Sequence, residues 1–174
     1  MHTAILIGDS AAIAATRDRL TSAGWDFDGA EVDAVVFDPG LFDGKVTGNP
    51  AEDLRRLARE LLPRLRSAAD GGAAIVAIGS RDQLGWADRP AIAAAAGALA
   101  AMVRSLALEL ASRGVTVNLV AGGTTEPGPL LPTTVTPADI AETVAFFADP
   151  RSRYITGQVL FCCGGSSLLS SLSV

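Results

Sequence analysis

Three residues whose side chains could take part in chemistry stand at the end of an apolar run, AAIVAIGS, at residues 73–80. Ser80, Arg81 and Asp82 place a hydroxyl, a guanidinium and a carboxylate side by side. A continuous apolar run of this kind is typical of a strand covered on both faces of a parallel sheet. Because α/β sheets bind ligands beyond the carboxyl ends of their strands, these side chains could bind an anion or polarise a carbonyl group. The simpler alternative, a turn with a cap, is the favoured interpretation.

Two adjacent cysteines, Cys162 and Cys163, end the last apolar run of the chain. Successive side chains on a strand point to opposite faces, and a bridge between neighbouring cysteines would be strained. With no His or Cys partner nearby, they are interpreted as small buried hydrophobic residues. The sequence therefore predicts neither a metal site nor a redox site.

The elements that position these residues alternate between strands and helices. Expected strands cover residues 3–7, 32–37, 73–80, 115–120 and 158–163, and residues 25–28 could form an edge strand. Helical patterns cover about 10–23, 50–65, 90–112 and 137–147, with apolar residues at three- and four-residue steps. This alternation predicts an α/β fold, a three-layer Rossmann-like doubly wound, mostly parallel sheet, in a single domain over residues 1–174.

Composition and charge narrow the class of protein. Of the 174 residues, 49% are hydrophobic and 19% charged, enough apolar material for one sizeable core. The net charge of −5 and the pI near 4.8 argue against a nucleic-acid partner.

No signal peptide is recognised, and the apolar stretch at 91–103 is shorter than the ~18 residues of a spanning helix. We therefore expect a cytoplasmic protein without a membrane partner.

Several segments, in order along nearly the whole chain, resemble the short-chain dehydrogenase/reductase (SDR) family. The segment YITGQVLFCCGG at 154–165 is similar to that family's ITGQ-strand-DGG ending. GVTVNLVAGG at 114–123 resembles its strand that ends in Pro-Gly, and VDAVVFDPG at 32–40 resembles its Asn-Asn-Ala-Gly strand. AAIVAIGS, followed by a helix that ends in ALELASRG at 107–114, completes the resemblance.

The resemblance implies a mechanism whose residues this chain lacks. Family members use a Tyr as general acid/base, a Lys one helical turn later to lower its pKa, and a Ser to orient the substrate oxygen. Ser80 matches the Ser, but the Tyr and Lys positions fall on Ala93 and Gly97. Neither side chain can move a proton, so we expect no catalytic residues and no enzyme activity.

The cofactor site implied by the resemblance is also incomplete. The family's G-x-x-x-G-x-G turn reads Gly8 to Ala14 here and keeps only its first glycine, while Asp9 adds a negative charge where a pyrophosphate would lie. The segment between the first strand and VDAVVF is also short, so the second/third-strand region of the usual fold is expected to be shortened or missing. We expect no bound cofactor and no cofactor-binding residues.

The leading hypothesis is a non-catalytic SDR-like subunit, a pseudoenzyme, that assembles with and supports an active NAD(P)-dependent short-chain dehydrogenase in a hetero-oligomer. Self-association is the other possibility for its partner. Family members usually associate through the helix that carries Tyr and Lys and through the C-terminal strand. The predicted interface residues are Ile92, Ala95, Ala96, Leu99, Met102, Val103, Val159 and Phe161.

Two alternatives remain open. One is an oxidoreductase or lyase with a divergent active site built on the residues that follow the 73–80 run. The other is a Rossmann-like ligand-binding or regulatory protein without chemistry. Saturable binding of NADH or NADPH would favour the first of these alternatives.

Overall fold

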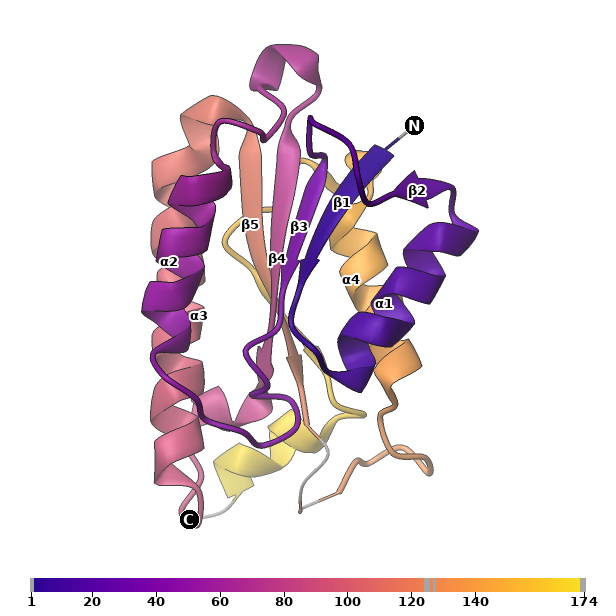
Figure 1. Ribbon diagram of the computed structural model, residues 1–174. Coiled ribbons are helices and arrows are strands. Elements are labelled where there is room, and N and C mark those ends of the chain that lie inside the picture. Colours follow the sequence, from indigo (N-terminus) through magenta and orange to yellow (C-terminus); the bar gives the residue numbers. More distant parts are fainter. Residues whose placement is uncertain (1, 124–125, 127, 173–174) are drawn as a thin grey trace.

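A six-stranded parallel sheet forms the centre of the computed structural model, which describes residues 2–123, 126 and 128–172 (Figure 1). The strand order is β2-β1-β3-β4-β5-β6, and all neighbouring strands pair in parallel. The strands are β1 (His2–Ile7), β2 (Trp25–Asp26), β3 (Ala34–Phe37), β4 (Ala73–Ser80), β5 (Val115–Gly122) and β6 (Val159–Cys162). The predicted parallel sheet is confirmed, and so is the edge strand near Trp25.

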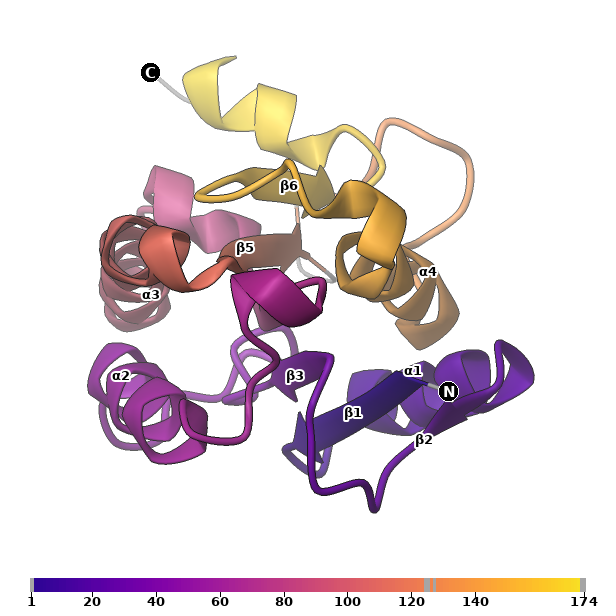
Figure 2. The same cartoon turned by 90° about the horizontal axis from the view of Figure 1, so that it is seen from above.

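Helices cover both faces of the sheet. The four α-helices are α1 (Ala11–Ser22), α2 (Pro50–Leu61), α3 (Pro90–Leu110) and α4 (Pro137–Ala148). Helices α2 and α3 lie on one face and α1 and α4 on the other (Figure 2), which confirms the three-layer, doubly wound prediction. The short 3₁₀ helices are η1 (Ala68–Asp70), η2 (Arg81–Leu84), η3 (Ala111–Arg113), η4 (Pro150–Ser152) and η5 (Ser166–Leu172).

Short polar side chains fix where the helices begin. Ser10 accepts a hydrogen bond from the backbone N–H of Ile13 at 3.1 Å and so caps α1. Thr136 and Asp139 form a reciprocal capping box at the start of α4. Each such cap satisfies backbone N–H groups that have no partner inside the helix. These capping residues therefore determine where α1 and α4 begin.

The interior is filled by aliphatic and small side chains. All residues of β4 and β5 are buried, as expected for central strands of a parallel sheet. Glycine allows the closest packing: a Cβ atom at Gly79 would lie 3.0 Å from a methyl carbon of Leu119. This dense packing holds the carboxyl ends of the strands in fixed positions.

The sheet is short on the β2 side. A doubly wound Rossmann sheet commonly carries two strands beyond its first strand, whereas here only the two-residue β2 lies beyond β1. No helix separates β2 from β3. The prediction that this region is shortened is confirmed, and the change in winding direction falls between β1 and β3.

The apolar stretch on α3 is longer than the run at 91–103 that the sequence indicated. Together with η3 the helix forms a 24-residue stretch, Pro90–Arg113, that contains an 18-residue window with a mean hydropathy of 1.8, so its length and composition would suffice to cross a membrane. The length argument based on residues 91–103 is therefore wrong. The core helix of a soluble protein also meets this criterion, and here Leu99 and Val103 are fully buried within the protein core.

Two leucines on opposite sides of α3 test this packing. We expect Leu99→Ala, at a site with 0% exposure, to lower the free energy of unfolding by about 2–5 kcal/mol because it leaves a cavity. The matched Leu108→Ala, at a site with 84% exposure, should change it by less than about 0.5 kcal/mol. Urea unfolding followed by circular dichroism measures both, and equal losses would contradict the described packing.

Candidate functional site

The candidate site lies at the edge of the sheet where β1, β3, β4 and β5 end. In an open α/β sheet, ligands bind at this edge, next to the point where the winding direction changes. The loops after these strands bring Ser10, Asp38, Arg81 and Gly123 to the edge. These residues divide into a pair after β1 and β3 and a network after β4 and β5.

The first pair joins the loops after β1 and β3. The hydroxyl of Ser10 donates to the Asp38 carboxylate at 2.5 Å, and the same carboxylate accepts from the N–H of Gly40 at 2.8 Å. Gly8 has a φ of 133°, and a Cβ atom there would lie 2.7 Å from the Asp38 carbonyl oxygen. Gly8 is therefore required by contact between the two loops, independently of any cofactor.

Burial changes the acidity of Asp38. Desolvation raises the pKa of this carboxyl above its usual value, Asp43 and Asp9 add repulsion, and the bonds from Ser10 and Gly40 offset part of the effect. The residue borders a pocket of about 470 Å³. The pocket is lined by Asp9, Phe37, Asp38, Pro39, Gly40, Lys45, Thr47, Asp53 and Arg56. Three carboxyl groups beside two cations make it a poor place for a pyrophosphate.

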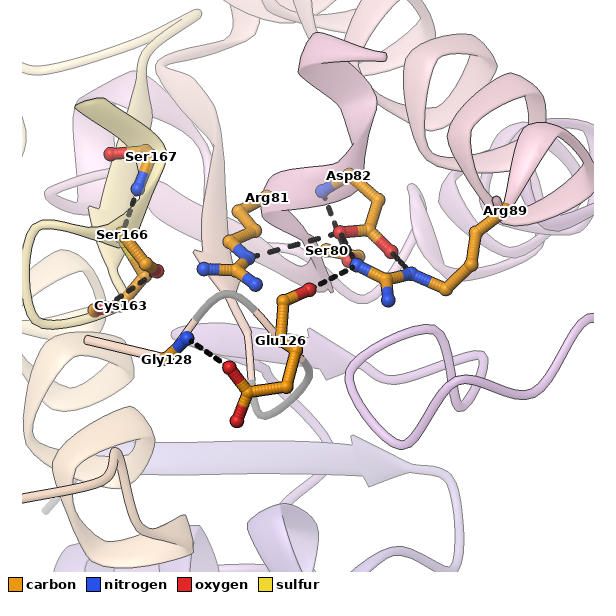
Figure 3. A network of polar contacts seen from close by, with 9 residues as sticks. All are labelled: Ser80, Arg81, Asp82, Arg89, Glu126, Gly128, Cys163, Ser166 and Ser167. Atoms are coloured by element: carbon orange, nitrogen blue, oxygen red, sulfur yellow. Dashed lines mark hydrogen bonds and ion pairs between the residues drawn. The ribbon is translucent and has the colours of Figure 1, made fainter. Parts of the chain in front are cut away.

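A polar network follows β4 and organises the turn into α3 (Figure 3). The Ser80 hydroxyl accepts from the N–H of Asp82 at 3.1 Å, and the Asp82 carboxylate accepts from Arg89 Nε at 2.8 Å and Nη2 at 3.3 Å. Arg89 also donates to the carbonyl oxygen of Glu126 at 3.2 Å. Ser80 thus caps η2, and the favoured interpretation of this segment as a capped turn is confirmed.

Arg81 is the largest fully buried side chain of the described chain, with 0% exposure. Its guanidinium lies over the Trp86 ring at 4.8 Å, and its Nε is 3.8 Å from Asp82 Oδ1. Burial lowers its pKa, against the attraction of Asp82 and Cys163. A Cβ atom at Gly123 would lie 2.6 Å from Arg81 Cδ. The side chain therefore fills the space beside Gly123, at the carboxyl end of β5.

The positions that the family resemblance assigns to the proton-transfer pair, Ala93 and Gly97, lie on the first turns of α3, which packs against η2. Ala93 is half-buried, and the nearest atom to a Cβ at Gly97 would be the Gln83 carbonyl oxygen at 4.0 Å. The chain's single tyrosine, Tyr154, lies beside Gly114 near the amino end of β5, at the opposite end of the sheet. The described residues therefore bring no tyrosine to Ser80.

The two cysteines are free thiols rather than a disulfide. Cys162 is half-buried and Cys163 buried, which agrees with their interpretation as small buried residues. Cys163 also has polar surroundings that the sequence did not reveal, since its sulfur accepts from the N–H of Ser167 at 3.4 Å. Burial opposes ionisation of this thiol, but hydrogen bonds from Ser167, Ser166 and Gly165 leave its pKa below the usual value. Among the described residues, no cluster of metal-binding side chains occurs.

The predicted interface residues separate into two groups. Ala96, Leu99 and Val103 are buried within the chain's own core, so the prediction that they contact a partner is wrong. The helical repeat located the apolar positions on α3 but could not tell inward-facing from outward-facing ones. The remaining residues are half-buried at the surface, where a partner contact stays a prediction. They are Ile92, Ala95, Met102, Val159 and Phe161.

Comparisons with known sequences relate the chain to oxidoreductases. Residues 52–128 match the enoyl-(acyl carrier protein) reductase family. Two relatives from Thauera aromatica are the subunits BbsC and BbsD of (2S)-[(R)-hydroxy(phenyl)methyl]succinyl-CoA dehydrogenase. Both are 39% identical, BbsC over 67% of this chain and 51% of its own length, and BbsD over 55% and 45%. The chain thus spans about half the length of these relatives.

Solved structures share the fold over nearly the whole chain. A short-chain dehydrogenase family protein from Francisella tularensis superposes with a TM-score of 0.79 at 18% identity, over 97% of this chain and 99% of that one. Levodione reductase gives a TM-score of 0.75 at 15% identity, over 96% and 98% of the two chains. The sequence matches support membership of the short-chain dehydrogenase/reductase family, and the solved structures show that the chain has that family's fold.

Asp38 provides a pH-dependent test of the buried pair. Because its pKa is raised in the folded protein, its ionisation destabilises the fold as pH rises above about 4, the usual range of a carboxyl group. We expect the stability of Asp38→Asn relative to the unsubstituted protein to improve between pH 3.5 and pH 7. Urea unfolding at several pH values measures this change.

Asp139→Asn is the control with the opposite sign. Hydrogen bonds from Thr136 lower the pKa of Asp139, so its carboxylate stabilises the fold above its usual pKa and this contribution is lost in acid. The relative stability of this variant should therefore fall as pH rises. Trends of the same sign in both variants would contradict the account of Asp38.

Proposed function

We propose that this chain is a non-catalytic subunit that assembles with and supports an active NAD(P)-dependent short-chain dehydrogenase. The observation that carries the proposal is the presence of Ala93 and Gly97 at the positions of the proton-transfer pair, on a fold that is otherwise that of the family. Two subunits named as parts of one dehydrogenase, BbsC and BbsD, are both relatives of this chain. An assembly of related subunits is therefore a consistent setting for it.

The carboxyl edge of the sheet supports a role without hydride transfer. Asp38 hydrogen-bonds the residue that caps α1, where an anionic phosphate would otherwise benefit from the helix N-terminus. Ser80, Arg81 and Asp82 are all buried and bonded within the chain, which disfavours the alternative of a divergent active site on these residues. In this proposal the partner binds the nicotinamide cofactor and provides the catalytic residues.

The outer side of α3 is the proposed contact surface. Its exposed positions recur at three- and four-residue steps and are mostly small, so a second helix could approach closely. The small ones are Ala91, Ala94, Ala98, Ala101 and Ser105, and Arg104, Leu108 and Glu109 are exposed as well. Leu108, with 84% exposure, would gain most from being covered. A second copy of the chain is the alternative occupant of this surface.

Purification of the tagged chain from its own host tests the assembly. We expect mass spectrometry to identify a co-eluting SDR-family protein that contains a Tyr/Lys pair, and we expect the eluted complex to show NAD(P)-dependent dehydrogenase activity. The substitution Ala98→Arg, on the exposed side of α3, should abolish co-elution because a long charged side chain would separate the helices. Recovery of the chain without such a protein would refute the proposal.

Ala14→Arg is the matched control for this experiment. It introduces the same side chain at an exposed alanine on α1, on the other face of the sheet. Co-elution should persist in this variant, and both variants should unfold at the same urea concentration as the unsubstituted chain. Loss of the partner in both variants would argue against a contact specific to α3.

Cofactor binding provides a separate test. Titration of the isolated chain with NADH and NADPH, followed by nicotinamide fluorescence, should show no saturable change up to about 1 mM, at the weak end of typical substrate affinities. Saturable binding with a micromolar Kd would instead favour an oxidoreductase with a divergent site.

A further inference from the structure

A second pocket lies near the amino end of β5, away from the edge where β1, β3 and β4 end. It has a volume of about 330 Å³ and is bordered by the η3–β5 turn and the segment that precedes β6. Its wall includes Ala111, Val115, Thr116, Arg153 and Tyr154. The family resemblance assigns no role to these residues, and the proposed subunit function does not use them.

Thr116 is a buried polar group at this pocket. Thr116 is only 6% exposed, and its Oγ1 has no hydrogen-bond partner among the described residues. The neighbouring N–H of Val117 is bonded to Thr156 Oγ1 at 3.0 Å, so this nearby backbone donor is already engaged. A buried hydroxyl without a partner is uncommon because its desolvation is not compensated.

Arg153 brings unused hydrogen-bond donors to the same wall. Its Nη2 donates to the carbonyl oxygen of Asp33 at 2.9 Å, whereas its buried Nε and Nη1 have no partner in the described part of the chain. Burial lowers its pKa in spite of the attraction of Asp33 and Asp149. The environment therefore compensates this positive charge only in part.

The two nearby carboxylates are already committed to other groups. Asp33 accepts from the N–H of Thr3 at 2.8 Å and pairs with Arg66 at 3.0 Å. Asp149 accepts from Arg151 in a close ion pair. Charge balance at Arg153 thus favours an additional anion.

We propose that this pocket binds a small oxyanion, a carboxylate or a phosphate, through Arg153 and Thr116. A guanidinium and a hydroxyl are complementary donors for such a group. Ala111 and Val115 supply apolar wall, and the fully exposed Tyr154 offers an aromatic surface for a planar substituent. A pocket of this volume falls within the usual range for small ligands. The proposal does not rest on the chain's role as a subunit.

Isothermal titration of the purified chain with benzoate, inorganic phosphate and the neutral benzamide tests the proposal. We expect saturable binding of at least one anion and none of benzamide, because the amide lacks the charge. The benzoate and phosphate arms identify which oxyanion is preferred. Absence of saturable binding for both anions, or equal binding of benzamide, would overturn the proposal.

Three variants locate the binding. Arg153→Gln should weaken anion binding by at least about tenfold, since it removes a charge-assisted contact. Thr116→Val should also weaken binding, yet leave the ligand-free protein at least as stable, because it removes an unpaired buried hydroxyl. Arg56→Gln, which removes an equal charge from a 63% exposed side chain at the pocket beside Asp38, is the control and should leave binding unchanged. Unaltered affinity in Thr116→Val and Arg153→Gln would place the anion elsewhere and overturn the proposal.

Discussion

The burial of Arg81 is the constraint on which the carboxyl edge of the sheet depends. A guanidinium removed from water is tolerated only where charges and rings surround it, and here Asp82 and Trp86 provide that environment. Asp82 is held in turn by Arg89, which also reaches the carbonyl oxygen of Glu126. Gly123 must lack a side chain to leave room for Arg81. Replacement of any one of these residues would disturb the turn between β4 and α3, the loop after β5, or both.

The packing of the fold does not depend on a bound cofactor. The sheet, the four α-helices and their caps depend on buried aliphatic residues and local hydrogen bonds, none of which requires a cofactor. The contact of Gly8 with Asp38, in particular, keeps the first glycine of the cofactor turn for a structural reason. Under the proposed function, Ala93 and Gly97 leave the packing of α3 intact and its exposed side available for another subunit.

The sequence predicted the fold well because strong periodic patterns determined it. The apolar run at 73–80 became β4 with the same bounds, and the expected capped turn follows it, with Ser80 as the cap. Arg81 could not be placed in the same way, since arginine is almost never fully buried and its partners Trp86 and Gly123 come from separate segments. The Ser10–Asp38 bond likewise joins residues 28 positions apart. The burial of Leu99 could not be predicted, because α3 is apolar on most of its positions and the sequence does not reveal which side of the helix faces the sheet.

The central claim, that this chain itself transfers no hydride, is tested most directly under single-turnover conditions. The isolated chain, in excess over NADPH, is mixed with a β-ketoacyl thioester, and absorbance at the nicotinamide band is followed. The account predicts no oxidation of NADPH above the rate of a protein-free blank, because no side chain able to move a proton occupies positions 93 and 97. Stoichiometric oxidation of NADPH that scales with the concentration of the chain would contradict it.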